Sequence, residues 1–136
     1  MTFDEMVELQ KKSGYRKKPR HEEHRIQSAA FRWFRSQFPH MRHNLFAIPN
    51  AGRRSEREGA YMKEEGLLPG VADVALMFPN KSYHACFFEF KTKTGRQSDS
   101  QKEWQNKIIQ DGFKYVIIRS VEEFVNEVYR YLNDKE

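Results

Sequence analysis

Two short apolar runs in the middle of this 136-residue chain contain ionisable side chains, and this combination constrains the fold more than any other feature. Residues 70–78 and 85–91 have the apolar and aromatic composition of buried strands, yet they include Asp73, Glu89 and Lys91. Carboxylates are rare in such runs without a compensating partner, because an unpaired buried charge costs several kcal/mol or is neutralised by a pKa shift. We expect that partner to be a divalent metal ion.

Strand geometry predicts that these charges converge. Side chains two residues apart lie on one face of a strand, so Glu89 and Lys91 point the same way. The Pro79-Asn80-Lys81 turn between the two runs predicts an antiparallel hairpin, which would bring Asp73 close to Glu89. One ammonium group does not neutralise two carboxylates at close range, so a hard cation with oxygen ligands would complete the charge balance.

Each of these residues also has a plainer interpretation. Asp73 could be a carboxylate at a strand end, and Glu89 with Lys91 could form the solvent-facing side of an edge strand. The apolar residues that follow Asp73, and Phe87 on the face of Glu89, argue against full exposure.

Several motifs accompany these charges in a fixed order. They are Glu23-x-x-x-Gln27, Ile48-Pro49-Asn50, Arg53-Arg54, Glu65-Gly66, Gly70-x-x-Asp73, Phe88-Glu89-Phe90-Lys91-Thr92 and Gly95-Arg96-x-Ser98-x-x-Gln101. In this order the chain resembles the VRR-NUC (virus-type replication-repair nuclease) family of the PD-(D/E)XK nuclease superfamily, from about residue 20 to about residue 125. Ala72 stands where that family usually has a proline, which leaves the start of the strand less certain but removes no acid or base.

The resemblance implies an α/β fold of the mixed α+β kind, with a restriction-endonuclease-like central mixed sheet flanked by helices. It also implies a metal-dependent endonuclease that uses Mg²⁺ or Mn²⁺ to hydrolyse DNA phosphodiester bonds. Four-way-junction cleavage by a homodimer is known among small proteins of this family, and the resemblance also suggests a phage or prophage origin with a role in replication or repair. No residue of this chain specifies branched over linear DNA.

The site residues implied by the resemblance are Asp73, Glu89, the Phe90 carbonyl and Glu23 around the metal, with Lys91 and Gln101 beside it. Glu23 is preferred as the glutamate of the first helix because of its spacing to Gln27, and Glu22 is a close competitor. A solvated glutamate near the start of a helix is the plainer interpretation of either residue.

Gln101 has two interpretations. Ser98-x-x-Gln101 is a capping box, in which the glutamine side chain bonds the backbone at the start of its helix. The resemblance places the same side chain at the active site. One amide cannot fill both roles in the same way, so the sequence leaves the choice open.

Five basic residues beside the predicted site are candidates for contacts with DNA phosphates: Arg53, Arg54, Lys93, Arg96 and Lys102. Most surface charges serve only solubility. The net charge of +5 favours a polyanionic partner without requiring one.

The rest of the chain divides by its hydrophobic periodicity and capping residues. We expect helices at residues 3–12, over a segment that ends near Phe38, and at residues 99–110. Two further helices are expected after capping boxes: one from Ser55-x-x-Glu58 to Gly66, and one after Ser120-x-x-Glu123. Further strands are expected at residues 44–49 and 115–118. We expect residues 1–20 to form a helical, basic arm and residues 21–136 to form one nuclease-like domain. No apolar run reaches the ~18 residues of a membrane span, and one cysteine excludes an internal disulfide, so we expect a cytosolic protein away from membranes. The resemblance implies that this is the phage or bacterial host cytosol.

Two other functions remain open. The chain could be a nucleic-acid-binding module with the nuclease fold but little cleavage, or an interaction subunit whose basic arm docks a partner. The intact set of Asp73, Glu89 and Lys91 favours catalysis over both.

Overall fold

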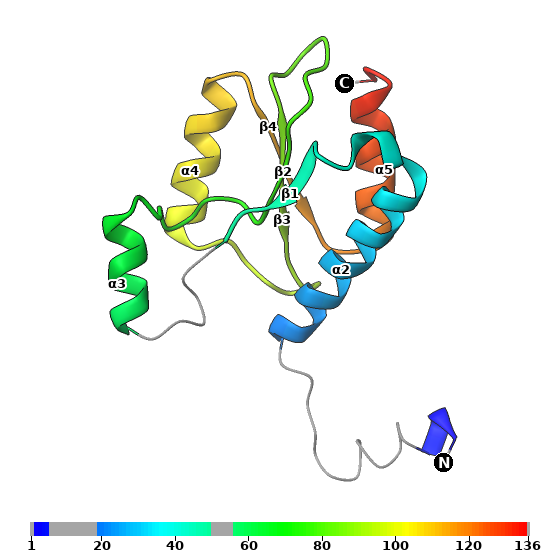
Figure 1. Cartoon of the computed structure of the whole chain (residues 1–136), viewed down its shortest axis with the longest axis horizontal. Coiled ribbons are helices and arrows are strands. Elements are labelled where there is room, and N and C mark those ends of the chain that lie inside the picture. Colours follow the sequence, from blue (N-terminus) through cyan, green and yellow to red (C-terminus); the bar gives the residue numbers. More distant parts are fainter. Residues whose placement is uncertain (1, 6–18, 50–55, 136) are drawn as a thin grey trace.

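The computed structural model describes residues 2–5, 19–49 and 56–135, and Figure 1 shows their arrangement. Residues 3–5 are helical. The elements that follow are α2 (Pro19–Gln37), the 3₁₀ helix η1 (Pro39–Met41), β1 (Leu45–Ala47), α3 (Glu56–Glu64), β2 (Val74–Leu76), β3 (Cys86–Phe90), α4 (Asp99–Gln110), β4 (Lys114–Ile118) and α5 (Val121–Leu132). Apart from η1, the order from α2 onwards is the predicted one. The remainder of the predicted helix 3–12, the basic link after it and Ser55 lie outside the described residues.

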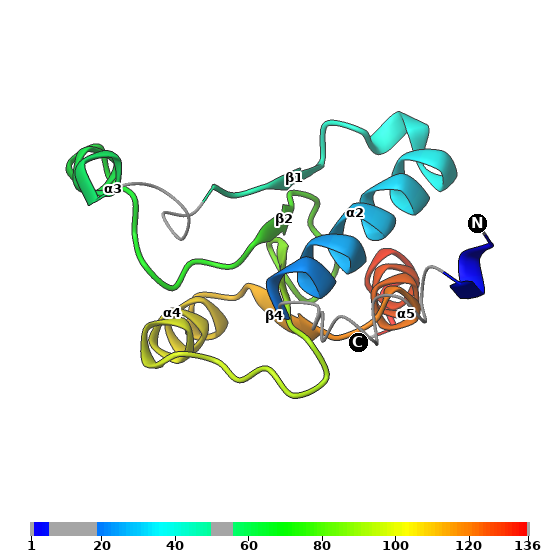
Figure 2. The ribbon, with the colours of Figure 1, turned by 90° about the horizontal axis from the view of Figure 1, so that it is seen from below.

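The four strands form one mixed sheet in the order β1-β2-β3-β4. Strands β1, β2 and β3 are antiparallel neighbours, as the turn at 79–81 predicts for β2 and β3, whereas β3 and β4 are parallel. A parallel pair needs a crossover connection, and α4 supplies it. Helix α4 covers one face of the sheet, and α2 and α5 cover the other (Figure 2). The predicted mixed sheet flanked by helices is therefore confirmed.

Alternation along β3 divides the core between the two faces of the sheet. Phe88 and Phe90 belong to the larger cluster of buried apolar side chains, on the side of α2 and α5. Phe87 faces the opposite way and packs on Trp104 of α4, with ring centroids 5.0 Å apart. Because Glu89 is two residues beyond Phe87, it lies on the α4 face.

The strand predicted over residues 70–78 is shorter than expected. The strand itself spans only Val74–Leu76, and Asp73 lies in a bend immediately before β2. Gly70 has a φ of +92°, which no regular strand allows. Beyond β2, Met77 and Phe78 are exposed. The prediction of one continuous buried strand was therefore wrong at both ends.

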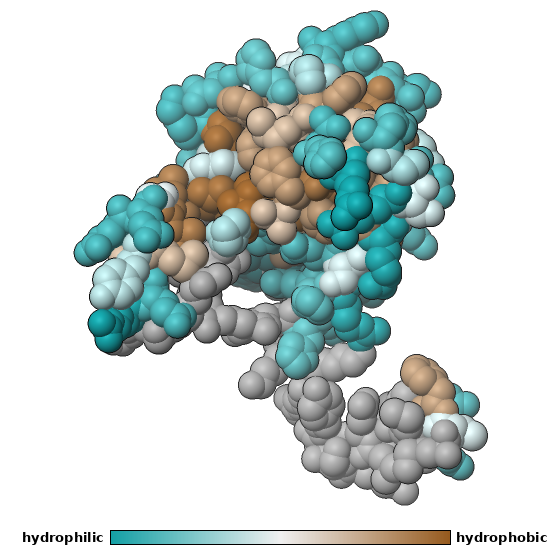
Figure 3. All heavy atoms as spheres, in the orientation of Figure 1, coloured by the Kyte–Doolittle hydropathy of each residue, from teal (hydrophilic) through white to brown (hydrophobic). Residues whose placement is uncertain are grey.

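Apolar and charged groups lie at opposite ends of β2. Met77 and Phe78 follow the strand, and they are exposed together with Phe46 of the edge strand β1. In the view of Figure 3, apolar side chains gather over the centre of the molecule and polar ones surround them. Asp73 immediately precedes β2. Among the described residues, no helix has the length and apolar character needed to cross a bilayer.

Candidate active site

The β2–β3 hairpin brings Asp73 and Glu89 together. Val74 pairs with Phe88, so continuing the antiparallel register by one residue places Asp73 opposite Glu89. The backbone N–H of Phe90 donates to Oδ2 of Asp73 at 2.8 Å, which fixes the aspartate against the end of β3. The convergence of the two carboxylates follows from strand pairing alone.

Gly70 allows the segment that carries Asp73 to pass directly against α4. Its φ of +92° favours glycine, and a Cβ at this position would lie 2.4 Å from the backbone oxygen of Ser100. A backbone atom cannot move aside as a flexible side chain can. The glycine of the Gly70-x-x-Asp73 motif therefore permits close contact between this segment and the first turn of the helix that carries Gln101.

Gln101 fills both of the roles that the sequence left open, one with each end of its side-chain amide. Its Oε1 accepts from the backbone N–H of Ser98 at 2.8 Å, which completes a capping box at the start of α4. Its Nε2 donates to Oε1 of Glu89 at 2.8 Å. The cap thus orients the amide that holds the glutamate.

Lys91 lies beside the same carboxylate. Its Nζ is 3.9 Å from Oε1 of Glu89, and its side chain is only 13% exposed. The backbone N–H of Lys91 donates to the carbonyl of Ile118, so the pairing with β4 continues one residue beyond β3. The lysine is therefore held on rigid backbone next to the two carboxylates.

Burial strongly perturbs the acid pair. Burial, and after it the charge of Asp73, raise the pKa of Glu89 to about 8, although Lys91 opposes both effects. Burial also raises the pKa of Asp73, while the hydrogen bond from Phe90 N–H lowers it. Without a cation, these shifts favour one proton at the pair over two ionised carboxylates.

The donors present suit a hard cation. Oε2 of Glu89 is buried and has no hydrogen-bond partner among the described residues, and such orphaned oxygens are uncommon in folded proteins. The available ligands are carboxylate and backbone oxygens, which Mg²⁺ and Mn²⁺ prefer. Within the described ranges, no three Asp, Glu, His or Cys side chains form a metal site by themselves. The paired carboxylates of Asp73 and Glu89 therefore fit a hard cation.

Glu23, not Glu22, faces the acid pair. Burial raises the pKa of Glu23, Lys91 lowers it and Asp73 raises it, so its carboxyl lies near both groups although it comes from the other face of the sheet. Glu22 is exposed and lines a neighbouring cleft. The geometry thus favours Glu23 as the acid of the first helix.

Three of the five candidate phosphate contacts are exposed on segments that adjoin this site in the chain. Lys93 and Arg96 are exposed in the segment between β3 and α4, and Lys102 is exposed in the first turns of α4. Arg53 and Arg54 lie outside the described residues.

Two contacts near the site were not predicted from the sequence. Gln97 donates from Nε2 to the hydroxyl of Tyr115 at 3.2 Å, and burial followed by the charge of Glu89 raises the pKa of that hydroxyl to about 12. Arg119 donates from Nη1 to the carbonyls of Thr92 and Gly95, which shapes the segment after Lys91. Both contacts depend on the parallel pairing of β3 with β4, for which the sequence has no local signal.

Comparison with known proteins identifies the fold. The sequence matches no protein-family model and no curated protein. Among solved structures, the chain is similar to a VRR_NUC domain protein, with a TM-score of 0.71 and 18% sequence identity, over 82% of this chain and 88% of that chain. At this identity the likeness concerns the fold. The chain therefore has the VRR-NUC nuclease fold, as the resemblance of its motifs predicts.

Proposed function

We propose that this protein is a metal-dependent deoxyribonuclease that hydrolyses DNA phosphodiester bonds. The observation that carries the proposal is the environment of Glu89. This carboxyl group is 3% exposed, lies opposite Asp73, accepts from Gln101 through one oxygen and has no partner for the other among the described residues. A structural carboxylate would rarely be buried in this way, whereas perturbed acid pairs are typical of catalytic sites.

In this proposal Asp73, Glu89 and the Phe90 carbonyl would hold Mg²⁺ or Mn²⁺, and Glu23 would act from outside these ligands. The chemistry that such an ion supplies, when bound, is polarisation of the scissile phosphate and a lower pKa for its bound water. Lys91 orients the attacking water and offsets negative charge that develops on the phosphate. Gln101 keeps the carboxylate of Glu89 in one orientation.

The DNA itself would be bound by basic side chains around this centre. The proposed phosphate contacts are Arg53, Arg54, Lys93, Arg96 and Lys102. Selectivity for branched or four-way DNA, a homodimer, a role in phage or prophage replication and repair within the host cytosol, and a separate basic arm at 1–20 are further parts of the proposal. They rest on the family resemblance.

A cleavage panel tests the proposal. Purified protein would be incubated with linear, single-stranded, flapped and four-way DNA in EDTA, Ca²⁺, Mg²⁺ or Mn²⁺. We expect cleavage with Mg²⁺ and Mn²⁺ only, because the larger and looser coordination of Ca²⁺ supports binding but positions the water poorly. Asp73→Ala and Glu89→Ala should each abolish cleavage while the thermal melt stays cooperative.

The outcomes separate the candidate functions. Cleavage that persists in EDTA, or in either carboxylate variant, would rule out the proposed metal site. DNA binding without cleavage under every condition would instead favour a binding module with the nuclease fold.

A further inference from the structure

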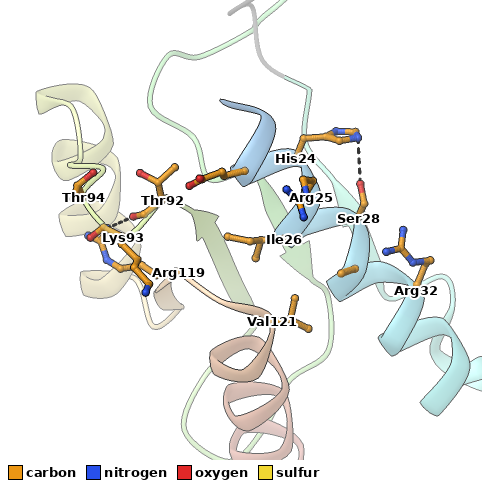
Figure 4. Close-up of a pocket in the computed structure, with 12 residues that line it drawn as sticks. His24, Arg25, Ile26, Ser28, Arg32, Thr92, Lys93, Thr94, Arg119 and Val121 are labelled. Atoms are coloured by element: carbon orange, nitrogen blue, oxygen red, sulfur yellow. Dashed lines mark hydrogen bonds between the residues drawn. The ribbon is translucent and has the colours of Figure 1, made fainter. Parts of the chain in front are cut away.

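A second charged feature lies beside the candidate active site, and of its four cations only Lys93 is among the phosphate contacts proposed above. It is a cleft of about 970 Å³ between α2, the segment after Lys91, and the junction of β4 with α5. Figure 4 shows Arg25 and Arg32 of α2 on one side, Lys93 and Arg119 on the other, and Ile26 and Val121 between them. The cleft therefore has cationic walls and an apolar floor.

The charge of this cleft is strongly one-sided. Arg25, Arg32, Lys93 and Arg119 contribute four positive charges, and Glu22 is the one acid among the lining residues. Arg25 and Arg32 are seven residues apart on α2, which places them about two turns, or roughly 10 Å, apart on the same side of the helix. Two fixed cations at such a spacing suit an extended polyanion better than a single small anion.

Arg119 ties the opposite wall to the rest of the fold. Its Nη1 donates to the backbone carbonyls of Thr92 and Gly95, the latter at 2.8 Å. Within the described part of the chain, its remaining guanidinium nitrogens make no hydrogen bond. The cleft wall is therefore held in shape by a cation that still has donors to offer.

The cleft adjoins the candidate active site through the chain. Thr92, Lys93 and Thr94 line it, and they follow Lys91 directly in the chain. If the scissile phosphate lies beside Lys91, as the proposed function requires, the neighbouring part of the same DNA strand would contact residues 92–94. This inference therefore rests on the proposed function. The cleft volume falls within the range of sites that enclose a ligand, roughly 300–1,000 Å³, so it suits an unpaired strand, whereas a duplex would lie across its mouth.

We propose that this cleft binds a single-stranded DNA segment adjacent to the scissile phosphate. Arg25, Arg32, Lys93 and Arg119 contact successive phosphates, and the sugars and base faces lie on Ile26 and Val121. This mode is backbone recognition with little sequence preference, in which affinity depends on salt.

The test compares two charge-matched double variants of the full chain. The cleft variant, Arg25→Gln with Arg32→Gln, removes two charges from the cleft. The outer variant, Arg35→Gln with Arg42→Gln, removes two exposed charges outside it, and Arg35 lies on the same helix. Binding of a labelled oligodeoxythymidylate and of a labelled duplex would be measured in EDTA over a range of salt concentrations, with thermal melts of all proteins.

For each protein, the logarithm of the binding constant is plotted against the logarithm of the salt concentration. For the oligodeoxythymidylate, the slope of this plot should be smaller in magnitude by about 1.4 in the cleft variant, since each single-strand phosphate contact contributes about 0.7. The same slope corresponds to about 25-fold weaker binding at 0.1 M salt. The outer variant should bind like the wild type, and the duplex should be affected much less by the cleft variant.

Equal losses in both double variants, or an equal loss for duplex and single strand, would overturn the cleft assignment. Duplex cleavage by the wild type in Mg²⁺ is measured separately. Cleavage without cleft-dependent binding leaves the proposed function standing and removes this inference. Cleft-dependent binding without cleavage keeps the cleft as a site for single-stranded DNA and removes the proposed deoxyribonuclease activity.

Discussion

The side-chain amide of Gln101 joins two elements that are separate in the sequence: Nε2 donates to Oε1 of Glu89 in β3, while Oε1 caps α4 at Ser98. A residue that stabilises its own helix is thereby also the residue that orients a buried carboxylate. Local stability and site geometry are coupled at this position and can be separated by mutation.

Gln101→Ala should reduce both stability and cleavage, because it removes the cap and the hydrogen bond to Glu89. The expected loss of cleavage is about 10–100-fold, the usual range for a residue that supports a metal ligand. Ser98→Ala is the matched control, since it removes the serine hydroxyl from the cap but keeps Gln101. It should lower the free energy of unfolding by about 1 kcal/mol with little effect on cleavage. Equal cleavage by the two variants would show that Gln101 only caps the helix.

The stability of the metal-free protein should fall as pH rises from about 4.5 to about 8. Glu89 has its pKa raised from 4.5 to about 8, so over this range the unfolded chain has released a proton that the folded protein still holds. Asp73 and Glu23 shift in the same direction. Thermal melts in EDTA across this range would measure the effect.

Glu89→Gln should remove most of this pH dependence and raise the melting temperature at pH 8, where the wild-type carboxyl is being forced to ionise. At pH 4.5 the two proteins should melt alike. Exposed Glu103→Gln on α4 is the control and should follow the wild type. A wild-type melting temperature that does not change between these pH values would mean that Glu89 is already charged in the folded protein.

Lys91→Ala should reduce turnover far more than DNA affinity, because the lysine is proposed to act on the attacking water and the transition state. Exposed Arg96→Ala should do the opposite, weakening binding while turnover at saturating DNA stays close to that of the wild type. Single-turnover cleavage and equilibrium binding in Ca²⁺ separate the two effects. If Lys91→Ala bound DNA weakly but turned over normally at saturation, its role would be phosphate binding.

Gly70→Ala should destabilise the protein more than Gly66→Ala. Both glycines have positive φ, +92° and +107° respectively, so either substitution meets backbone strain on the order of 1–3 kcal/mol. Only Gly70 would also place its Cβ against the backbone of Ser100, whereas a Cβ at Gly66 meets no atom within 4 Å. Chemical denaturation of both variants isolates the contribution of the contact with α4. Similar losses would show that strain at φ, and not this contact, requires the glycine.

Much of the fold could be predicted from the sequence, because its signals are local. The turn at 79–81 predicts the β2–β3 hairpin, and the hairpin brings Asp73 and Glu89 together without any other part of the chain. The helix after Ser98 and the helix after Ser120 begin where their capping residues predict, since a cap involves only backbone within one turn. The length of the strand predicted over residues 70–78 was overestimated, because the apolar composition of this segment carries no information about the bend at Asp73.

The tertiary structure alone decided which side chains from distant elements meet around that hairpin. The contact of Gln101 with Glu89, the position of Gly70 against Ser100, and the hydrogen bonds of Arg119 all arise where α4 crosses over and β4 pairs in parallel with β3. The proximity of Glu23 to Asp73 and Lys91 and the cationic cleft depend in the same way on how α2 packs. Such contacts join residues far apart in the chain, so no local propensity or spacing encodes them; they follow from burying both faces of one sheet.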